Sequence, residues 1–84
     1  MENLAKQAVQ AIEAYKSNKC IMDFVMREAL EKTAADIREK TKSGTTAKAV
    51  EILMIRNEEV KNRVQEYVLS GLIGCYMASI QRSA

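Results

Sequence analysis

The sequence contains no histidine and no proline, and it has only three glycines and two cysteines. Without histidine the chain lacks the commonest general base and the commonest metal ligand. The two isolated cysteines have no zinc-binding spacing, and no imidazole is present to activate either thiol as a nucleophile. No strand-like segment precedes Gly44, which excludes a phosphate-binding loop. We therefore expect a protein that is not an enzyme and that binds no cofactor and no metal.

The lack of proline and the scarcity of glycine also bear on the fold class. Residues that favour helices are abundant, namely Ala, Glu, Lys, Gln, Met and Leu. The chain has 84 residues, of which 48% are apolar, and this is enough for one globular domain and no more. The composition predicts a single all-α domain that spans residues 1–84.

The charge and the apolar stretches favour an intracellular location. A net charge of +2 is too small to indicate nucleic acid or an anionic membrane by itself. The first residues contain an early acid and no long apolar run, unlike a secretory signal. The C-terminal apolar stretch, residues 67–80, is shorter than the roughly 20 residues that cross a bilayer. We expect a cytoplasmic protein without membrane contact, in which Cys20 and Cys75 are reduced, buried thiols.

Apolar residues recur every three or four positions over most of the chain, which is the spacing of an amphipathic helix. The pattern predicts an antiparallel bundle of three long helices, over about residues 3–16, 20–42 and 46–82. The apolar face of the first helix consists of Leu4, Ala8, Ile12 and Tyr15, and it is widened by Ala5, Val9 and Ala11. The apolar face of the second consists of Met22, Val25, Met26, Ala29, Leu30, Thr33 and Ile37.

Short polar segments separate these helices. Ser17 or Asn18 is suited to cap the second helix, because both side chains accept hydrogen bonds from free N–H groups. Gly44 fits the position just past the end of the second helix. Thr45 or Thr46 can cap the helix that follows.

The last predicted helix is too long for a compact domain, and Asn57 lies where it can break. A straight helix over residues 46–82 would be about 55 Å long, against a radius of gyration of about 12 Å for a domain of this size. If the helix breaks, Asn57 caps a fourth helix that begins with Glu58 and Glu59. If it continues, Val50, Asn57 and Val64 share one heptad position, and Asn57 sets the register of a two-stranded coiled coil. In a third alternative, Asn57 is an exposed polar residue on a curved helix.

The stretch from Tyr67 to Ile80 is apolar around most of its circumference, so that two neighbouring helices cannot easily cover it. Small residues spaced by four, such as Gly71 and Cys75, allow another helix to approach closely. That helix is either the first helix or the same helix of a second copy. The predicted interface with a second copy or another protein consists of Asn57, Val60, Val64, Tyr67, Gly71, Gly74, Cys75 and Ala78.

The turn between the second and third predicted helices is the candidate site for a charged ligand. A helix that begins there offers free backbone N–H groups, two hydroxyls and nearby lysines to a phosphate or carboxylate. The candidate anion contacts are Lys40, Lys42, Thr45, Thr46 and Lys48. The alternative is an ordinary capped turn with solvated lysines.

These observations favour a non-catalytic protein–protein interaction module, such as an adaptor, a chaperone or an inhibitor of a larger partner. The uncovered C-terminal helix predicts self-association, with a homodimer favoured. The alternative function is a small nucleic-acid-binding regulator that uses the basic turn 38–48.

Overall fold

The computed structural model describes residues 2 to 83, with side chains from residue 5 to residue 82. Within that range the chain forms helices without strands: α1 (Glu2–Tyr15), α2 (Lys19–Thr41), α3 (Ala47–Arg56) and α4 (Glu58–Ser83). The all-α class and the helical bundle are confirmed. The bundle has the four-helix form, because the predicted helix over residues 46–82 ends and restarts at Asn57.

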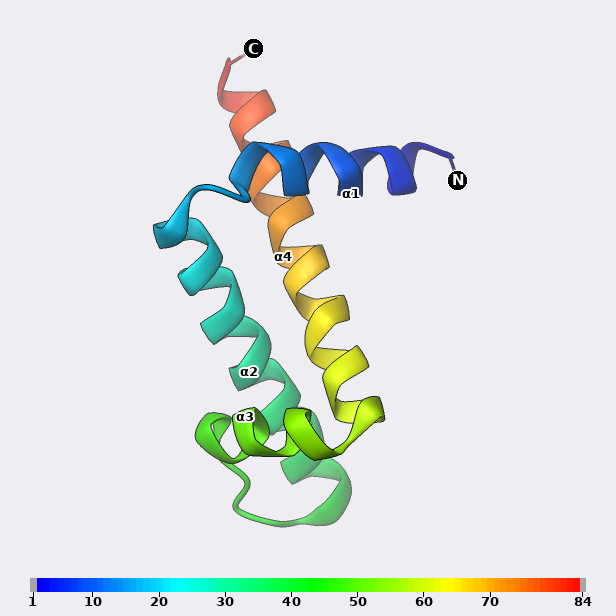
Figure 1. Cartoon of the computed structure of the whole chain (residues 1–84), viewed down its shortest axis with the longest axis vertical. Helices are drawn as coiled ribbons and strands as arrows, with labels where there is room; N and C mark the ends of the chain where they lie inside the picture. The colour runs from blue at the N-terminus through cyan, green and yellow to red at the C-terminus, as the bar shows by residue number, and fades with distance from the viewer. Residues whose placement is uncertain (1, 84) are drawn as a thin grey trace.

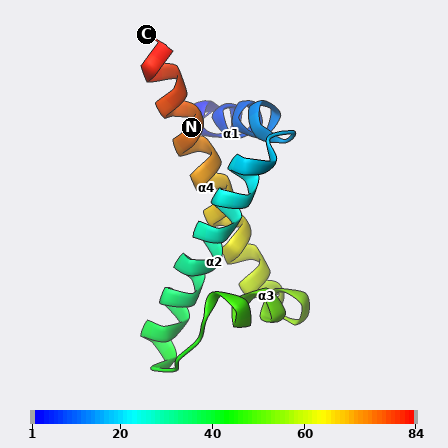
Figure 2. The ribbon, with the colours of Figure 1, turned by 90° about the vertical axis from the view of Figure 1, so that its left-hand side faces the viewer.

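The two longest helices, α2 and α4, lie side by side and antiparallel (Figure 1). The shorter helices cross this pair, α1 against α4 at one end and α3 against both long helices at the other (Figure 1). Figure 2 shows that α1 and α3 lie on the same side of the pair, which we call the α1–α3 side. The molecule is elongated, with extents of 44 × 28 × 21 Å and a radius of gyration of 14.1 Å. A compact domain of this length has a radius of gyration of about 12 Å.

Side-chain caps determine where two of the helices begin. The Asn18 side chain accepts a hydrogen bond from the Ile21 N–H at 3.1 Å, and Thr46 Oγ1 accepts one from the Ala49 N–H at 3.3 Å. Both caps confirm the sequence prediction. The prediction for Gly44 is wrong, because the left-handed residue after α2 is Lys42, with φ of 57°.

The turn after α2 closes earlier than predicted because side chains and backbone bond across it. The Lys42 N–H donates to the Arg38 carbonyl at 2.9 Å, and the Arg38 guanidinium donates to the Thr45 carbonyl at 2.8 Å. The hydroxyls of Thr41, Ser43 and Thr45 form a chain of hydrogen bonds, each 2.7 Å long. The turn is therefore ordered without a left-handed glycine.

Asn57 separates α3 from α4. Its backbone is extended, with φ of −127° and ψ of 110°, and its N–H donates to the Leu53 carbonyl at 2.8 Å. Its side-chain oxygen accepts a hydrogen bond from the Val60 N–H at 3.2 Å, and Glu58 and Glu59 form the first turn of α4. Asn57 is thus a cap, and the prediction that it sets the register of a continuous coiled coil is wrong. The break allows Val50 and Val64 to enter one core cluster, which a straight helix would hold apart.

The core consists of two small clusters. One lies where α2, α3 and α4 meet, and its buried members are Ala29, Leu30, Ala34, Val50 and Val64. The other lies where α1, α2 and α4 meet, and its buried members are Ala11, Val25 and Leu72. The largest fully buried side chains are three valines and Thr33, whose hydroxyl donates to the Ala29 carbonyl at 2.8 Å. Small core side chains bring the helices close together and leave most of the large apolar residues at least partly exposed.

The predicted apolar faces are confirmed only in part. On α2, Val25, Ala29, Leu30 and Thr33 are buried, whereas Met26 is exposed. On α1, Ala11 is the residue that reaches the core, because α1 crosses α4 instead of lying along it, and Ile12 is exposed. The side chain of Leu4 lies outside the described residues.

The apolar stretch over residues 67–80 is mostly half-buried within the chain. Leu72 is its single buried residue, and Ser70, Gly74, Ser79 and Ile80 are exposed. A Cβ atom on Gly71 would lie 3.0 Å from Val25 Cγ1, so the close approach at this glycine is to α2. The sequence did not point to α2 as the helix that approaches Gly71 closely.

Candidate functional site

The lining of an apolar groove of about 400 Å³ includes residues of α1 and α3, which places the groove on the α1–α3 side. Residues of α2 and α4 form its floor, α1 forms one end and α3 contributes Met54 at the other. We call it the methionine groove, and its lining consists of Ile12, Lys16, Met22, Met26, Met54, Val64, Gln65, Val68, Leu69 and Leu72. Its volume lies in the range of about 300–1,000 Å³ that is usual for binding pockets.

The crossing geometry creates this groove. Because α1 and α3 cross the long pair at its two ends, neither covers the middle of the α1–α3 side (Figures 1 and 2). The cap at Asn18 turns the chain from α1 into α2, and the caps at Thr46 and Asn57 define the ends of α3. Local hydrogen bonds at three turns thus hold the two ends of the groove in place.

The side chains of the groove are flexible and partly open to solvent. Met26 is 39% exposed and Ile12 is 42% exposed, while Met22 and Met54 are half-buried. Methionine is unbranched and polarizable, and it adapts to differently shaped apolar partners. Lys16 is the charged residue of the lining, and its ammonium group is 2.9 Å from the Glu13 carboxylate. The groove therefore offers apolar contact rather than a free charge.

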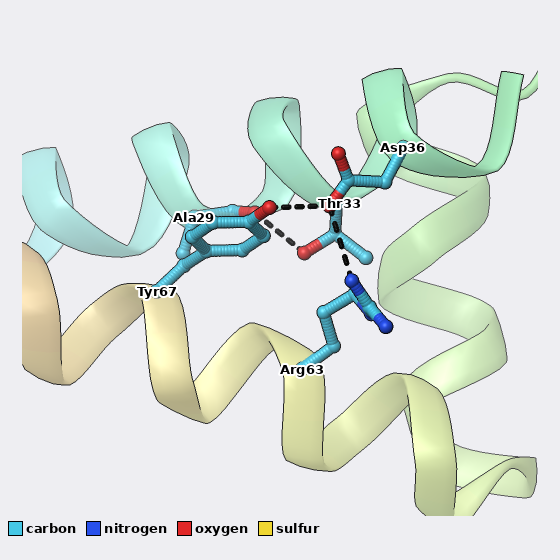
Figure 3. A network of polar contacts seen from close by, with 5 residues as sticks. All are labelled: Ala29, Thr33, Asp36, Arg63 and Tyr67. Atoms are coloured by element: carbon cyan, nitrogen blue, oxygen red, sulfur yellow. Dashed lines mark hydrogen bonds and ion pairs between the residues drawn. The ribbon is translucent and has the colours of Figure 1, made fainter. Parts of the chain in front are cut away.

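A polar cluster of Asp36, Arg63 and Tyr67 links α2 to α4 (Figure 3). The Tyr67 hydroxyl donates to Asp36 Oδ2, and the Arg63 guanidinium lies 3.4 Å from the same oxygen. Lys32 adds a cation–π contact, with its ammonium 5.9 Å from the centre of the Tyr67 ring. Tyr67 and Leu69 are two residues apart, about 200° around the helix, so the cluster and the groove lie on different flanks of α4.

The electrostatics of this cluster suit a structural contact. The hydrogen bond to the Asp36 carboxylate raises the pKa of Tyr67 above its ordinary value of 10.0, and burial and the charge of Asp36 act in the same direction. A phenol with a raised pKa stays protonated at neutral pH and is a poor general base or nucleophile. The cluster holds the two long helices in register.

The predicted interface residues are not brought together on one surface. Val64 is fully buried in the core of the chain itself, and Val60 and Tyr67 are half-buried between α2 and α4. Asn57 is exposed, and its side chain caps α4. Val64 therefore cannot serve an outward-facing interface in this fold, because its side chain is already enclosed.

The other predicted interface residues line an open hollow of about 720 Å³ beside the C-terminal half of α4. These residues are Gly71, Gly74, Cys75 and Ala78, and they lie together with Tyr15, Ile21, Ser79 and Arg82. Both cysteines are free thiols. Cys75 is half-buried, whereas Cys20 is exposed, so the prediction of a buried thiol is wrong for Cys20.

The candidate anion contacts surround the turn between α2 and α3. Lys40, Lys42 and Lys48 are exposed. The hydroxyls of Thr45 and Thr46 already have partners, since Thr45 bonds to Ser43 and Thr46 caps α3. The arrangement is that of a capped turn with solvated lysines.

Sequence periodicity identified only part of the groove. Met22 and Met26 were expected on the buried face of the second helix, whereas Met54, Gln65 and Leu69 had no assigned role. The spacing of Met22 and Met26 by four residues was the available signal. This spacing does not indicate where α1 and α3 cross the α2–α4 pair. Because of that crossing, the side chains of Met22 and Met26 are only partly covered.

The described residues were also searched for a metal-binding cluster and for a membrane-spanning helix. In residues 2–83 no three His, Cys, Asp or Glu side chains are grouped so that they could hold a metal ion. Over the same range, the helices are too short or too polar to cross a bilayer. No protein-family model, curated protein or solved structure matches the chain.

Proposed function

We propose that the chain is a non-catalytic protein-interaction module whose binding surface is the α1–α3 side. The observation that carries this proposal is the methionine groove, an open apolar groove between α1 and α3. Apolar grooves between helices receive apolar side chains from a helix of another protein. The nearest polar cluster is occupied in joining α2 to α4, which supports a binding role rather than catalysis.

This proposal keeps the protein-binding function expected from the sequence and changes the surface that performs it. The sequence pointed to the C-terminal helix, of which Val64 is enclosed in the core and Tyr67 is bonded to Asp36. The α1–α3 side combines the groove with exposed large apolar residues, among them Ile12, Met26 and Ile55. An adaptor, chaperone or inhibitor would use such a surface to cover an apolar segment of its partner.

A comparison of two charge-introducing variants tests the proposal. Met26→Glu places a carboxylate in the groove, whereas Phe24→Glu places the same group on α2 about 200° away from both Met22 and Met26. Phe24 is 53% exposed, so the control changes an exposed apolar residue in the same helix. The immobilised wild-type chain and Phe24→Glu should retain the same protein, either another protein from a native lysate or the purified chain itself. Met26→Glu should lose it. Retention that is equal for all three forms, or absent for all three, would contradict the proposal.

A further inference from the structure

The outward side of α3 carries two largely exposed isoleucines. Ile52 is 58% exposed and Ile55 is 85% exposed. Val50, two residues before Ile52, faces the core, and this spacing places Ile52 about 200° away from it around the helix. The outward side of α3 therefore exposes Ile52 and Ile55 to solvent in the isolated chain, and it also carries the exposed Lys48 and Arg56, each four residues from Ile52.

The exposed isoleucines and the methionine groove belong to the same side of the molecule. α3 crosses the α2–α4 pair on the α1–α3 side (Figures 1 and 2). The groove has Ile12 and Lys16 of α1 and Met54 of α3 in its lining, so it lies between these two helices. The charge at the groove is already countered, because Lys16 pairs with Glu13 at 2.9 Å. The lining thus suits branched aliphatic side chains, and the chain itself presents two of them on a helix.

The accessible surface area of the protomer can be compared with the area that is usual for a monomer of the same mass. The chain exposes 6302 Å², with a mass of 9.4 kDa. A monomeric globular protein of this mass exposes about 5,000 Å². The excess is roughly 1,300 Å², and a stable interface of standard size buries about 800 Å² on each partner. One interface with a second copy accounts for the greater part of the excess.

We infer that a second copy of the chain covers the α1–α3 side, and that Ile52 and Ile55 of each protomer enter the methionine groove of the other. This inference rests on the proposed function and names its partner. Each protomer carries its groove and its isoleucines on the same side. A single two-fold axis can therefore place the isoleucines of each protomer in the groove of the other. The assembly then closes as a dimer and leaves neither groove open.

Sedimentation of the full chain at micromolar concentration tests the inference with three variants. The wild type should have twice the protomer mass of 9.4 kDa. Ile55→Glu and Met26→Glu should each raise the dissociation constant about a hundredfold or more, because symmetry buries each new carboxylate twice. Phe24→Glu should remain dimeric. Helical circular dichroism should be unchanged in all three, and Met26→Gln replaces Met26→Glu if the latter unfolds.

Mixing Met26→Glu with Ile55→Lys tests the reciprocal geometry. Ile55→Lys retains an intact groove, and Met26→Glu retains intact isoleucines. In the mixed dimer one contact is undamaged and the other places an ammonium group beside the new carboxylate, so the mixture should sediment as a dimer at a concentration where each variant alone is a monomer. A symmetric contact of groove with groove, or of α3 with α3, predicts no such rescue, and its absence overturns the inference.

The remaining outcomes separate this inference from the proposed function. A monomeric wild type, or a dimer that both variants leave intact, overturns the inference. If the wild type is monomeric but retains another protein that Met26→Glu loses, the proposed function stands with a different occupant. If neither a second copy nor another protein binds through Met26, both fail.

Discussion

The hydrogen bond from the Tyr67 hydroxyl to the Asp36 carboxylate connects α4 to α2. Tyr67→Phe removes this bond and keeps the aromatic ring. We expect this variant to lose about 1 kcal/mol of unfolding free energy at neutral pH, as is usual for one hydrogen bond. Urea denaturation with an unchanged slope would measure it. Tyr15→Phe is the control, because Tyr15 takes no part in the polar cluster. An equal loss in both variants would contradict the assignment.

The same contact predicts a pH dependence at the alkaline end. The pKa of Tyr67 is raised above 10.0 in the folded chain, mainly by its hydrogen bond to Asp36. The folded state therefore holds the phenolic proton more tightly than the unfolded state does. Its contribution to stability is fully present below pH 10 and is lost as the pH rises through the folded pKa. Unfolding free energies measured across this range should fall more steeply for the wild type than for Tyr67→Phe.

Gly71 and Gly74 of α4 allow a matched comparison of two alanine variants. A Cβ atom on Gly74 has nothing within 4 Å in the described residues, whereas one on Gly71 lies 3.0 Å from the buried, β-branched Val25. Gly74→Ala should stabilise the chain by about 0.5–1 kcal/mol through helix propensity. Gly71→Ala gains the same propensity but overpacks the core at a cost of about 1–3 kcal/mol. Thermal unfolding should rank Gly74→Ala above the wild type and Gly71→Ala below it, and the reverse order would refute the contact.

At the scale of the elements, Asn57 determines where α3 ends and α4 begins. Asn57→Ala removes the hydrogen bond to the Val60 N–H and should cost about 1 kcal/mol of unfolding free energy. Asn62→Ala is the control, because Asn62 is an exposed residue inside α4, where alanine is the better helix former. Urea denaturation of both variants measures the difference. A loss that does not exceed that of Asn62→Ala would contradict the capping role.

Local signals explain what could be predicted about the elements. The caps at Asn18 and Thr46 follow from one side chain and the N–H group three residues later, so the sequence alone contains them. At Asn57 a capping pattern and a heptad pattern coexisted, and the burial of Val50 and Val64 in one cluster favours the cap. That burial depends on residues far apart in the chain, which helical periodicity does not report. The groove was missed for the same reason, because the crossing of α1 and α3 forms it.

At the scale of the whole molecule, the inferred dimer predicts that stability depends on protein concentration. If dimer formation covers the α1–α3 side, the thermal midpoint should rise with protein concentration, because the folded state alone binds a second copy. Ile55→Glu should abolish this dependence and leave the helical signal of the folded chain unchanged. Phe24→Glu should retain it. A midpoint that is independent of concentration in the wild type would count against association.

The single extended residue between α3 and α4 has a consequence for how the fold forms. The orientation of α3 depends on the backbone torsions at Asn57, and the change of direction there lets Val50 reach the same core cluster as Val64. A free-standing helix as short as α3, with its 10 residues, is marginal in water. The helical conformation of α3 is therefore stabilised by its packing against α2 and α4. In hydrogen exchange its amides should open together with the first turns of α4, as one cooperative unit.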